Sequence, residues 1–324
     1  MQGIRDRVAI VGMGCTQFGE HWDKSANDLM VDAVYEAVED AGISPSDIQA
    51  AWLGTSSSGR RGSMLAYPLK LDYIPVTRVE NACATGTDAM RNACYSVAAG
   101  IYDVVLVSGV EKLKDSGYSG LPLYPEVTTS QTDPPCPAPV QFALAATRYF
   151  HHYGLSFEEG KRILAQIAVK NHHNGTMSPK AHFHREITVE QALKAPMVAW
   201  PLGLFDCCGV SDGSAAAIIT RAELAPSFRK DYVLVKGLGV ACGAREAQTR
   251  NDYDFVHFEE NVRAAKTAYR EAGIEDPRKE ISVAEVHDCF TITELIIYED
   301  LGLSPRGGGP ADVEAGTFSL EGEV

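Results

Sequence analysis

The sequence predicts an α/β fold in which largely buried strands alternate with helices. Residues 8–11 form a continuous apolar run typical of a buried strand. Residues 25–41 carry apolar side chains at helical spacing, with Ser25 as a candidate N-cap and Gly42 as a candidate stop. Residues 102–109 are rich in β-branched side chains, as strands are. This alternation predicts a sheet that helices cover.

The middle of the chain has a different texture from its two ends. Residues 128–139 form a Pro-rich loop, which neither a helix nor a sheet interior accommodates. Residues 140–152 and 157–173 have helical patterns, and residues 211–220 return to a turn and a strand of small side chains. We therefore expect a mostly helical insert within an α/β unit.

A diffuse internal repeat indicates two copies of one α/β unit. The triplet Ala-Gly-Ile begins at residues 41 and 272, and the same offset of 231 residues carries the first strand to residues 233–239. The alternative is that Ala-Gly-Ile is simply a common helix ending, but strands are expected on both sides of each copy. The predicted domains are residues 1–112 with 206–230, an insert at 113–205, and a second half at 231–324 that lacks its final strands.

Composition and charge exclude several classes of protein. The 324 residues include 29 Lys and Arg against 43 Asp and Glu, a net charge of −14, which disfavours a nucleic-acid binder. No apolar run reaches the roughly 18 residues of a membrane span, and the polar start of the chain does not resemble a signal peptide. The eight cysteines show no repeating spacing, which favours free thiols. We therefore expect a cytoplasmic globular protein.

Two motifs that suggest ligand sites are weak. Gly12-Met13-Gly14 follows a strand and predicts a tight turn, but the third glycine of a dinucleotide-binding fingerprint is missing because residue 17 is Gln. Six of the nine histidines lie in the insert, yet adjacent His-His pairs on a helix point in different directions. We predict a solvated face there and no metal site. Several Lys and Arg residues share this segment, where an acidic chain offers positive charge to a phosphate-rich ligand.

Cys83 is the strongest candidate for a nucleophile. It lies between a short predicted strand and an Ala-rich helix, where the helix dipole is expected to lower the thiol pKa from about 8.5. Gly86 leaves room for another backbone or for an N–H group that faces the site. The alternative is a buried cysteine used as a small hydrophobe, a role that we assign to Cys15, Cys94, Cys207, Cys208 and Cys242.

A second cluster of reactive side chains occupies residues 285–295, where a predicted strand meets its next helix. His287 can donate a hydrogen bond to a thioester oxygen, and Cys289 can move a proton if its thiol titrates near working pH. The alternative, about equally supported by the pattern, is a capping cluster with Asp288 as the N-cap of the helix.

At these two motifs the sequence resembles the thiolase superfamily, and within it the sterol-carrier-type and archaeal acetoacetyl-CoA thiolases. The resemblance spans essentially the whole chain. It is carried by VENACATG at 79–86, VLVSGVEK at 105–112, AVKNH at 168–172, SDGSAAA at 211–217 and VHDCF at 286–290. Other thiolases carry an Asn-Glu-Ala-Phe motif where this branch has His-Asp-Cys-Phe.

The resemblance implies a fold and a set of roles. The fold would be a thiolase-like five-layered αβαβα core of two repeated halves, with a helical loop domain over the acyl-CoA. Cys83 matches the nucleophile, His287 the oxyanion-hole histidine and Cys289 the acid/base cysteine. Breaking a carbon–carbon bond beside a thioester needs these three functions. Coenzyme A would be the co-substrate, no cofactor would be covalently bound, and the expected contacts of coenzyme A are Lys170, His172, Lys180 and Arg185.

One family motif is missing from these residues. Members of the family continue into a loop with Gly-His-Pro, whose histidine activates the nucleophile, whereas this sequence ends at Val324 without it. We expect either a further C-terminal segment or a protein that does not turn over alone, and we favour the first.

The resemblance also implies partners and a substrate class. A homodimer is expected, with Tyr95, Val97 and Ala98 near its interface. A small partner, a zinc ribbon joined to an OB-fold, would help to bind coenzyme A and would hold the only zinc. Benzoylsuccinyl-CoA is one candidate substrate, because the Pro-rich insert could shape an aromatic acyl pocket. Two alternatives stay open: a thiolase-like aldolase acting on a CoA thioester, and a non-catalytic acyl-CoA-binding subunit.

Overall fold

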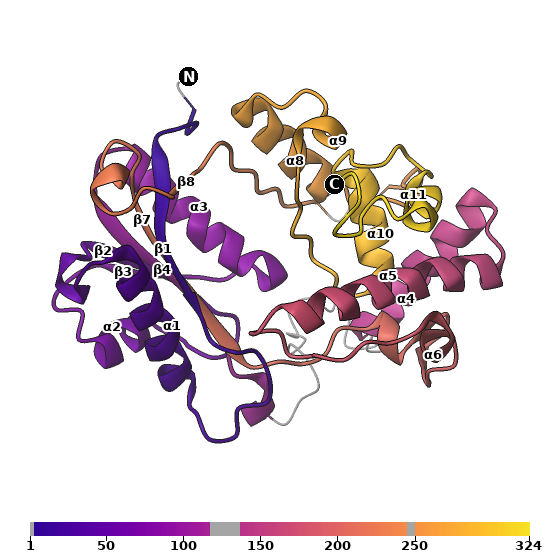
Figure 1. The fold of residues 1–324 in the computed structure, drawn as a ribbon, viewed down its shortest axis with the longest axis horizontal. Helices are drawn as coiled ribbons and strands as arrows, with labels where there is room; N and C mark the ends of the chain where they lie inside the picture. The colour runs from indigo at the N-terminus through magenta and orange to yellow at the C-terminus, as the bar shows by residue number, and fades with distance from the viewer. Residues whose placement is uncertain (1–2, 117–136, 245–249) are drawn as a thin grey trace. The chain divides into compact units, whose positions relative to one another are not determined.

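The computed structural model describes residues 3–116, 137–244 and 250–324, which divide into two compact units (Figure 1). Each unit has its own hydrophobic core, so each is described by itself. Unit 1 comprises Met1–Pro122, Lys180–His182 and Val210–Leu238, and unit 2 comprises Leu123–Pro179, Phe183–Gly209 and Gly239–Val324.

A six-stranded mixed sheet forms the centre of unit 1. β2 runs parallel to both β3 and β4, whereas β7 runs antiparallel to both β4 and β1. The expected α/β class and the strands expected near residues 8, 104 and 213 are therefore confirmed. In spatial order the strands are β3 (Val76–Val79), β2 (Ala50–Gly54), β4 (Val104–Glu111), β7 (Gly213–Arg221), β1 (Val8–Cys15) and β8 (Val233–Leu234).

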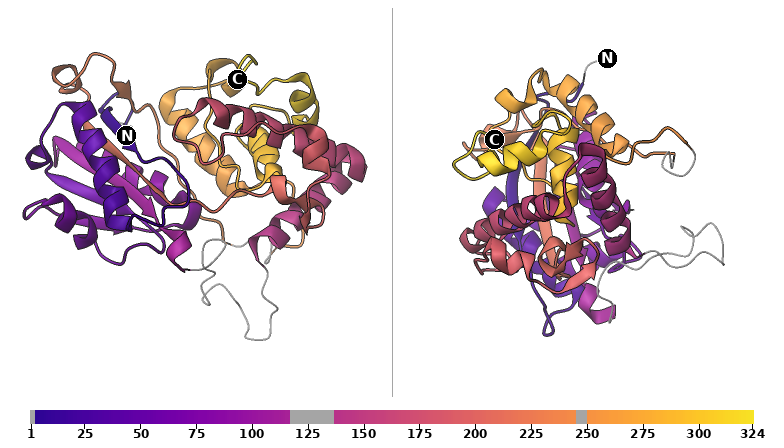
Figure 2. Two further views of the ribbon diagram at one scale, coloured as in Figure 1. Left: turned by 60° about the horizontal axis from the view of Figure 1, so that its bottom comes forward. Right: turned by 90° about the vertical axis from the view of Figure 1, so that its right-hand side faces the viewer.

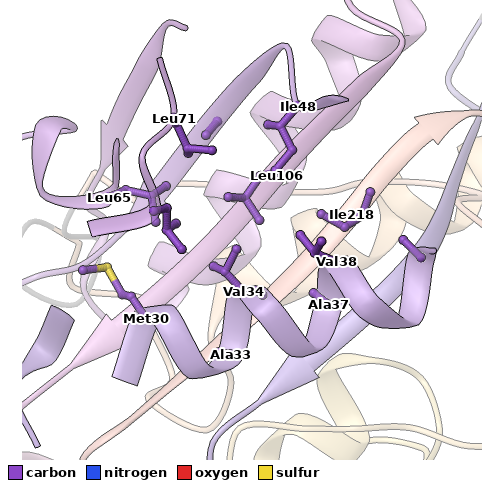
Figure 3. Close-up of a cluster of buried hydrophobic side chains, with 14 of the residues drawn as sticks. Met30, Ala33, Val34, Ala37, Val38, Ile48, Leu65, Leu71, Leu106 and Ile218 are labelled. Atoms are coloured by element: carbon purple, nitrogen blue, oxygen red, sulfur yellow. The ribbon is translucent and has the colours of Figure 1, made fainter. Parts of the chain in front are cut away.

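Helices cover both faces of this sheet. α1 (Ala26–Ala41) and α2 (Ser63–Leu69) pack on one face, and α3 (Thr85–Ala98) packs on the other. Figure 3 shows the first of these layers, in which Val34 and Val38 of α1 point towards the strands that carry Leu106 and Ile218. Alternate residues of each strand serve the two cores, as the period of a strand requires. Unit 1 also contains the short 3-10 turns η1 (Pro45–Asp47), η2 (Ala82–Ala84), η3 (Leu113–Ser116) and η6 (Ala225–Ser227).

The two ends of α1 are the ones that the sequence predicts. The Ser25 hydroxyl accepts a hydrogen bond from the backbone N–H of Asp28, whose carboxylate accepts one from the backbone N–H of Ser25. This reciprocal pair is a capping box. Gly42 ends the helix at φ 69°, in the left-handed region that glycine adopts without steric cost.

The turn predicted at Gly12 and Gly14 is wrong, because β1 continues through both residues to Cys15. Their role is to let α1 approach the strand. A Cβ atom on Gly12 would lie 2.3 Å from the Ala37 carbonyl oxygen, and one on Gly14 would lie 2.3 Å from that of Ala33. The glycine pair that imitates a dinucleotide fingerprint is thus a packing feature.

Unit 2 is mostly helical (Figure 1, Figure 2). Every residue of α10 (Thr291–Asp300) is buried, and apolar side chains of α4 (Ala138–Tyr153) and α5 (Phe157–Met177) pack around it. The helices predicted at 140–152 and 157–173 are confirmed as α4 and α5. The other elements are α6 (Val189–Leu193), α8 (Glu259–Ala272), α9 (Pro277–Glu280), α11 (Gly309–Ala315), η5 (Leu204–Asp206), and the two-stranded sheet of β5 (Met197–Ala199) and β6 (Leu202–Gly203).

The described residues of the predicted second repeat do not build a sheet of their own. Val233 and Leu234 form β8, which pairs with β1 in unit 1. Residues 281–286, expected as a strand, have no strand conformation. A strand needs a hydrogen-bonded neighbour, and within the three described ranges no named strand pairs with this segment. The helix that the repeat predicts before the second Ala-Gly-Ile triplet is present as α8, with Gly273 at its end.

The compact units cut across the predicted insert. α4 and α5 share a core with α10 because their apolar faces pack against it. Most of the Pro-rich loop predicted at 128–139 lies outside the described residues. In the part of the chain that the structure describes, no helix is both long and apolar enough to cross a membrane.

Candidate active site

Cys83 occupies the strand-to-helix turn that the sequence predicts. It is the central residue of η2, between β3 and α3, and its side chain is exposed. The preceding residue, Ala82, has φ +46°, which is unfavourable for a residue with a Cβ atom. Such backbone strain is characteristic of functional sites. The turn therefore presents the thiol at the beginning of a helix.

A set of hydrogen bonds holds this strained turn. The Thr85 hydroxyl accepts a hydrogen bond from the Asn81 backbone N–H at 2.8 Å and donates one to the Ala82 carbonyl at 2.6 Å. Further along α3, the buried Asp88 carboxylate accepts hydrogen bonds from the Asn81 side-chain amide and from Arg91 Nε. The sequence motifs do not predict these partners, although Asp88, a lone acid in an Ala-rich helix, is a signal for them.

The carboxyl ends of parallel strands meet beside this turn, as in other α/β sites. A Cβ atom on Gly54, the last residue of β2, would lie 3.1 Å from the Thr85 methyl group. In the loop that follows, the Ser57 and Ser58 hydroxyls donate hydrogen bonds to Glu111, at the end of β4, at 2.8 and 2.9 Å. These hydrogen bonds hold the carboxyl ends of β2 and β4 together beside the Cys83 turn.

The predicted lowering of the Cys83 pKa is wrong. Protein atoms around the thiol reduce its hydration and raise its pKa, and the only opposing contribution, from its own backbone N–H, is smaller. The thiol of Cys83 is therefore protonated at neutral pH, and a nucleophilic role requires a base. Two of the cysteines assigned to packing also have a raised pKa because of burial, Cys94 at about 12 and Cys207 at about 11.

The second predicted motif, residues 287–290, lies in unit 2 immediately before α10. Phe290 forms an isolated antiparallel bridge with Cys207, and the Cys208 backbone N–H donates to the Cys289 carbonyl at 3.0 Å. The Phe290 ring stacks on Phe142 with 4.5 Å between ring centroids. The backbone on either side of the Cys289 thiol is thus anchored.

Asp288 does not cap α10, so the capping alternative is wrong. Phe290 occupies the N-cap position and makes no side-chain capping bond. The Asp288 carboxylate instead accepts a hydrogen bond from the Asn171 side-chain amide at 2.8 Å. Asp288 keeps an exposed surface, yet the protein atoms around its carboxyl raise its pKa, and the negative charge of Glu294 raises it further.

Asn171 links this motif to a buried glutamate. Its amide nitrogen also donates to Glu294 at 2.5 Å, and the other carboxylate oxygen of Glu294 accepts hydrogen bonds from Lys170, at 2.6 Å, and from the Tyr298 hydroxyl. Glu294 is 1% exposed. The sequence motifs do not predict this residue, although an acid among the apolar residues at the start of α10 indicates a buried partner.

The four residues predicted to contact coenzyme A lie in different surroundings. Lys170 is paired with Glu294 in unit 2, and Lys180 is paired with Glu36 in unit 1. His172 Nδ1 lies 3.0 Å from the Arg185 carbonyl oxygen, and its ring packs edge-on against Phe205. Arg185 lines a hollow of about 400 Å³ together with Ile187, Glu190, Gln191, Lys194 and Phe205.

The predicted catalytic residues thus fall into two groups. Cys83 belongs to unit 1, whereas His287 and Cys289 share unit 2 with Lys170, His172 and Arg185. No group of His, Cys, Asp or Glu in the described ranges is arranged to hold a metal ion.

Comparisons with known proteins match the chain over nearly its whole length. The thiolase N-terminal domain matches residues 8–223, and a thiolase C-terminal domain-like family matches residues 241–324. An acetyl-CoA acetyltransferase of Methanothermobacter thermautotrophicus is 35% identical, with 99% of this chain and 83% of the relative covered. The benzoylsuccinyl-CoA thiolase subunit BbsB of Thauera aromatica is 31% identical, with 94% and 78% covered.

A solved structure titled Ltp2-ChsH2(DUF35) aldolase has the same fold, with a TM-score of 0.83 at 24% identity, covering 99% of this chain and 83% of that one. The fold and the Cys83 turn define an α/β protein with a thiol at the start of a helix. The chain belongs to the thiolase superfamily, a class of acyltransferases that act on coenzyme A thioesters.

Proposed function

We propose that this protein is a thiolase that cleaves or forms a β-ketoacyl-CoA through an acyl-enzyme on Cys83. The observation that carries the proposal is the strained turn, which places an exposed thiol at the start of α3 and at the carboxyl ends of parallel strands. The acetyl-CoA acetyltransferase relative supports this reaction class.

In the cleavage direction, the Cys83 sulfur attacks the β-keto carbonyl and becomes a thioester. The carbon–carbon bond between the keto carbon and the α carbon then breaks, and its electron pair passes into a thioester enolate. His287 donates a hydrogen bond to the enolate oxygen, and the Cys289 thiol protonates the α carbon, which releases the acetyl-CoA portion with the original coenzyme A. The thiol of a second coenzyme A then gives its proton to the Cys289 thiolate and attacks the acyl-Cys83 thioester, which releases the shortened acyl-CoA and regenerates Cys83. Because the Cys83 pKa is raised, a base must remove its proton before the first attack.

Trapping the acyl-enzyme tests the role of Cys83. The protein is incubated with acetoacetyl-CoA in the absence of free coenzyme A, and mass spectrometry then maps the acetyl group. We expect one acetyl group on Cys83, none in Cys83→Ala, and unchanged labelling in Cys242→Ser, which alters another exposed cysteine. Label on any other residue would refute the proposal. Full turnover by Cys83→Ala would instead indicate the aldolase alternative, and binding of coenzyme A without turnover would indicate a non-catalytic subunit.

For the acyl group we propose an aromatic substrate such as benzoylsuccinyl-CoA, supported by the likeness to BbsB. The values of kcat/KM for acetoacetyl-CoA and for an aromatic β-ketoacyl-CoA distinguish the two substrate classes. A preference for acetoacetyl-CoA would reject the aromatic assignment.

We further propose a homodimer and a small zinc-ribbon and OB-fold partner that helps to bind coenzyme A. β3 is an edge strand of the unit 1 sheet, so its outer backbone groups are available for pairing with a second copy. Of the residues expected at the interface, Val97 is completely buried in the core of unit 1, whereas Tyr95 is exposed. Molar mass in solution, measured with and without the co-expressed partner, tests both associations.

A further inference from the structure

We propose that Asn171 and Glu294 are positioning residues that hold the His287–Cys289 segment in its working geometry. This inference rests on the proposed function, because it assigns a role to residues outside the reacting groups. Asn171 lies on α5 and Glu294 on α10, and Asp288 lies between the two side chains that the mechanism uses.

The geometry makes Asn171 the link between the segment and the core of unit 2. A side-chain amide has two N–H donors. One hydrogen-bond distance joins Asn171 Nδ2 to Asp288 Oδ2, at 2.8 Å, and another joins the same nitrogen to Glu294 Oε2, at 2.5 Å. Both donors therefore go to carboxylates, and the orientation of the amide is determined.

Glu294 in turn is fixed from its other side. Its Oε1 accepts hydrogen bonds from Lys170 Nζ and from the Tyr298 hydroxyl. The side chain is 1% exposed, and a buried carboxylate is tolerated only when it is paired and hydrogen-bonded. The chain of contacts therefore runs without a break from Lys170 through Glu294 and Asn171 to Asp288.

The position of the Asp288 backbone determines where the side chains of its neighbours, His287 and Cys289, lie. The hydrogen bond from Asn171 connects the Asp288 side chain to α5. The Cys208 backbone N–H donates a hydrogen bond to the next carbonyl, that of Cys289, at 3.0 Å. A displacement of about 1 Å at a reacting group costs on the order of 100-fold in rate. Loss of the Asn171 contact is therefore expected to affect His287 and Cys289 through the backbone that they share with Asp288.

Charged groups act on Asp288 from its own segment, from α5 and from α10. Lys170 of α5 and His287 of its own segment favour the ionised carboxylate, whereas Glu294 of α10 opposes it. Neutralising Glu294 would thus change the electrostatics at the segment as well as its support.

α10 provides a matched control. Glu299 is also buried on this helix, at 4% exposure, and also accepts a hydrogen bond from a tyrosine hydroxyl, that of Tyr149 at 2.5 Å. Its second hydrogen bond comes from the Gly309 backbone N–H and not from the motif. Glu294→Gln and Glu299→Gln therefore remove the same charge from the same helix, but only the first affects the link to Asp288.

The experiment compares Asn171→Asp, Glu294→Gln and Glu299→Gln with the unaltered protein. Asn171→Asp keeps the side-chain shape but removes both donors and places a carboxylate beside those of Asp288 and Glu294, so it breaks the link both by loss of hydrogen bonds and by repulsion. We measure kcat and KM with acetoacetyl-CoA, and separately the rate at which iodoacetamide alkylates Cys289 as a function of pH, resolved by mass spectrometry. Cys242, which is exposed, is the internal standard for alkylation.

Asn171→Asp and Glu294→Gln should lower kcat by about 10-fold to 100-fold with KM changed less than about twofold. Both should also alter the rate or pH dependence of Cys289 alkylation, whereas Glu299→Gln should change neither. Wild-type values of kcat and alkylation in the first two variants, or equal losses in Glu299→Gln, would overturn the proposal. If the unaltered protein turns over no CoA thioester, the proposed function fails, and Cys289 alkylation alone decides the positioning role.

Discussion

Lys112 and Asp212 form a buried ion pair that joins two strand ends in unit 1. Lys112 Nζ lies 2.9 Å from Asp212 Oδ2, and the two side chains are 3% and 0% exposed. Asp212 also accepts hydrogen bonds from the backbone N–H groups of His21 and Lys114. Asp212 directly precedes β7 and Lys112 directly follows β4, so the pair ties the start of β7 to the end of β4.

We predict that Asp212→Asn destabilises the protein by about 3 kcal/mol, because the substitution leaves part of the buried Lys112 charge unpaired. Urea unfolding followed by circular dichroism measures the change in the free energy of unfolding. The matched control is Asp231→Asn, at an exposed ion pair, which should cost much less than Asp212→Asn because solvent screens the pair. Equal effects of the two substitutions would contradict this prediction.

The same aspartate gives a pH dependence with a definite sign. Burial alone would raise the Asp212 pKa, but hydrogen bonds from Lys112, Lys114 and His21 outweigh it, and the net pKa lies below the usual 3.8. A carboxyl group with a lowered pKa stabilises the fold above its unfolded-state pKa, and this contribution is lost as the pH falls through the folded-state pKa. The destabilisation caused by Asp212→Asn should therefore be full at pH 7 and smaller below pH 3.8. A difference that grows on acidification would contradict it.

At the residue scale, the sequence predicts where the reactive groups lie but not which residues hold them in place. The strand-to-helix position of Cys83 follows from local patterning, which a single sequence contains. Its raised pKa does not, because desolvation depends on atoms from distant segments. The link from Asn171 to Asp288 and Glu294 spans more than one hundred positions of the chain, so no local spacing predicts it.

At the scale of elements, two glycines illustrate opposite constraints. In the packed contact between β1 and α1, a Cβ atom on Gly14 would lie 2.3 Å from backbone. In α3, a Cβ atom on Gly86 would meet no described atom within 4 Å. One substitution therefore tests close packing and the other tests whether open space at the start of α3 serves the substrate.

We predict that Gly14→Ala destabilises the protein by more than about 2 kcal/mol, because backbone must move to admit the methyl group. Gly86→Ala should be neutral or stabilising by up to about 1 kcal/mol, because alanine favours the helix. The same Gly86→Ala should raise the KM for acetoacetyl-CoA if substrate uses this space. Thermal unfolding and steady-state kinetics check the pair, and stability losses of similar size in both variants would contradict the assignment.

The helices were more predictable than the strands at this scale. Ser25 and Gly42 define α1 by local hydrogen bonding and backbone conformation, which depend on neighbouring residues only. The strand predicted at 281–286 depends on a partner segment, and none pairs with it in the described ranges. A pattern of apolar residues is therefore insufficient to predict pairing.

At the scale of the whole molecule, the sheet of unit 1 collects strands from distant parts of the chain. β7 lies between β4 and β1 and pairs with both along most of its length. The helices of unit 2 also come from both sides of β7 in the sequence, because α4 and α5 precede β7 and α8 and α10 follow it. Contact between distant segments, and not the order of predicted elements, thus determines the compact units.

We predict that a chain truncated after residue 205 does not form the unit 1 sheet, because β7 is the strand that joins β1 to β4 among the described residues. Hydrogen exchange along β4 measures this directly, since every second backbone N–H group of β4 points to β7 in the intact sheet. Exchange should be slow in the intact protein and fast in the truncated one. Slow exchange in the truncated chain would show that β1 and β4 find another partner.

The central place of β7 also has a consequence for biosynthesis. When β4 leaves the ribosome, about one hundred residues must still be translated before β7 follows, which takes on the order of 10 s at about 5–20 residues per second. During this interval the facing edges of β1 and β4 are open to pairing with other nascent chains. Production of the protein should therefore depend strongly on chaperones that shield such edges, and a slower translation rate between β4 and β7 would prolong the exposure.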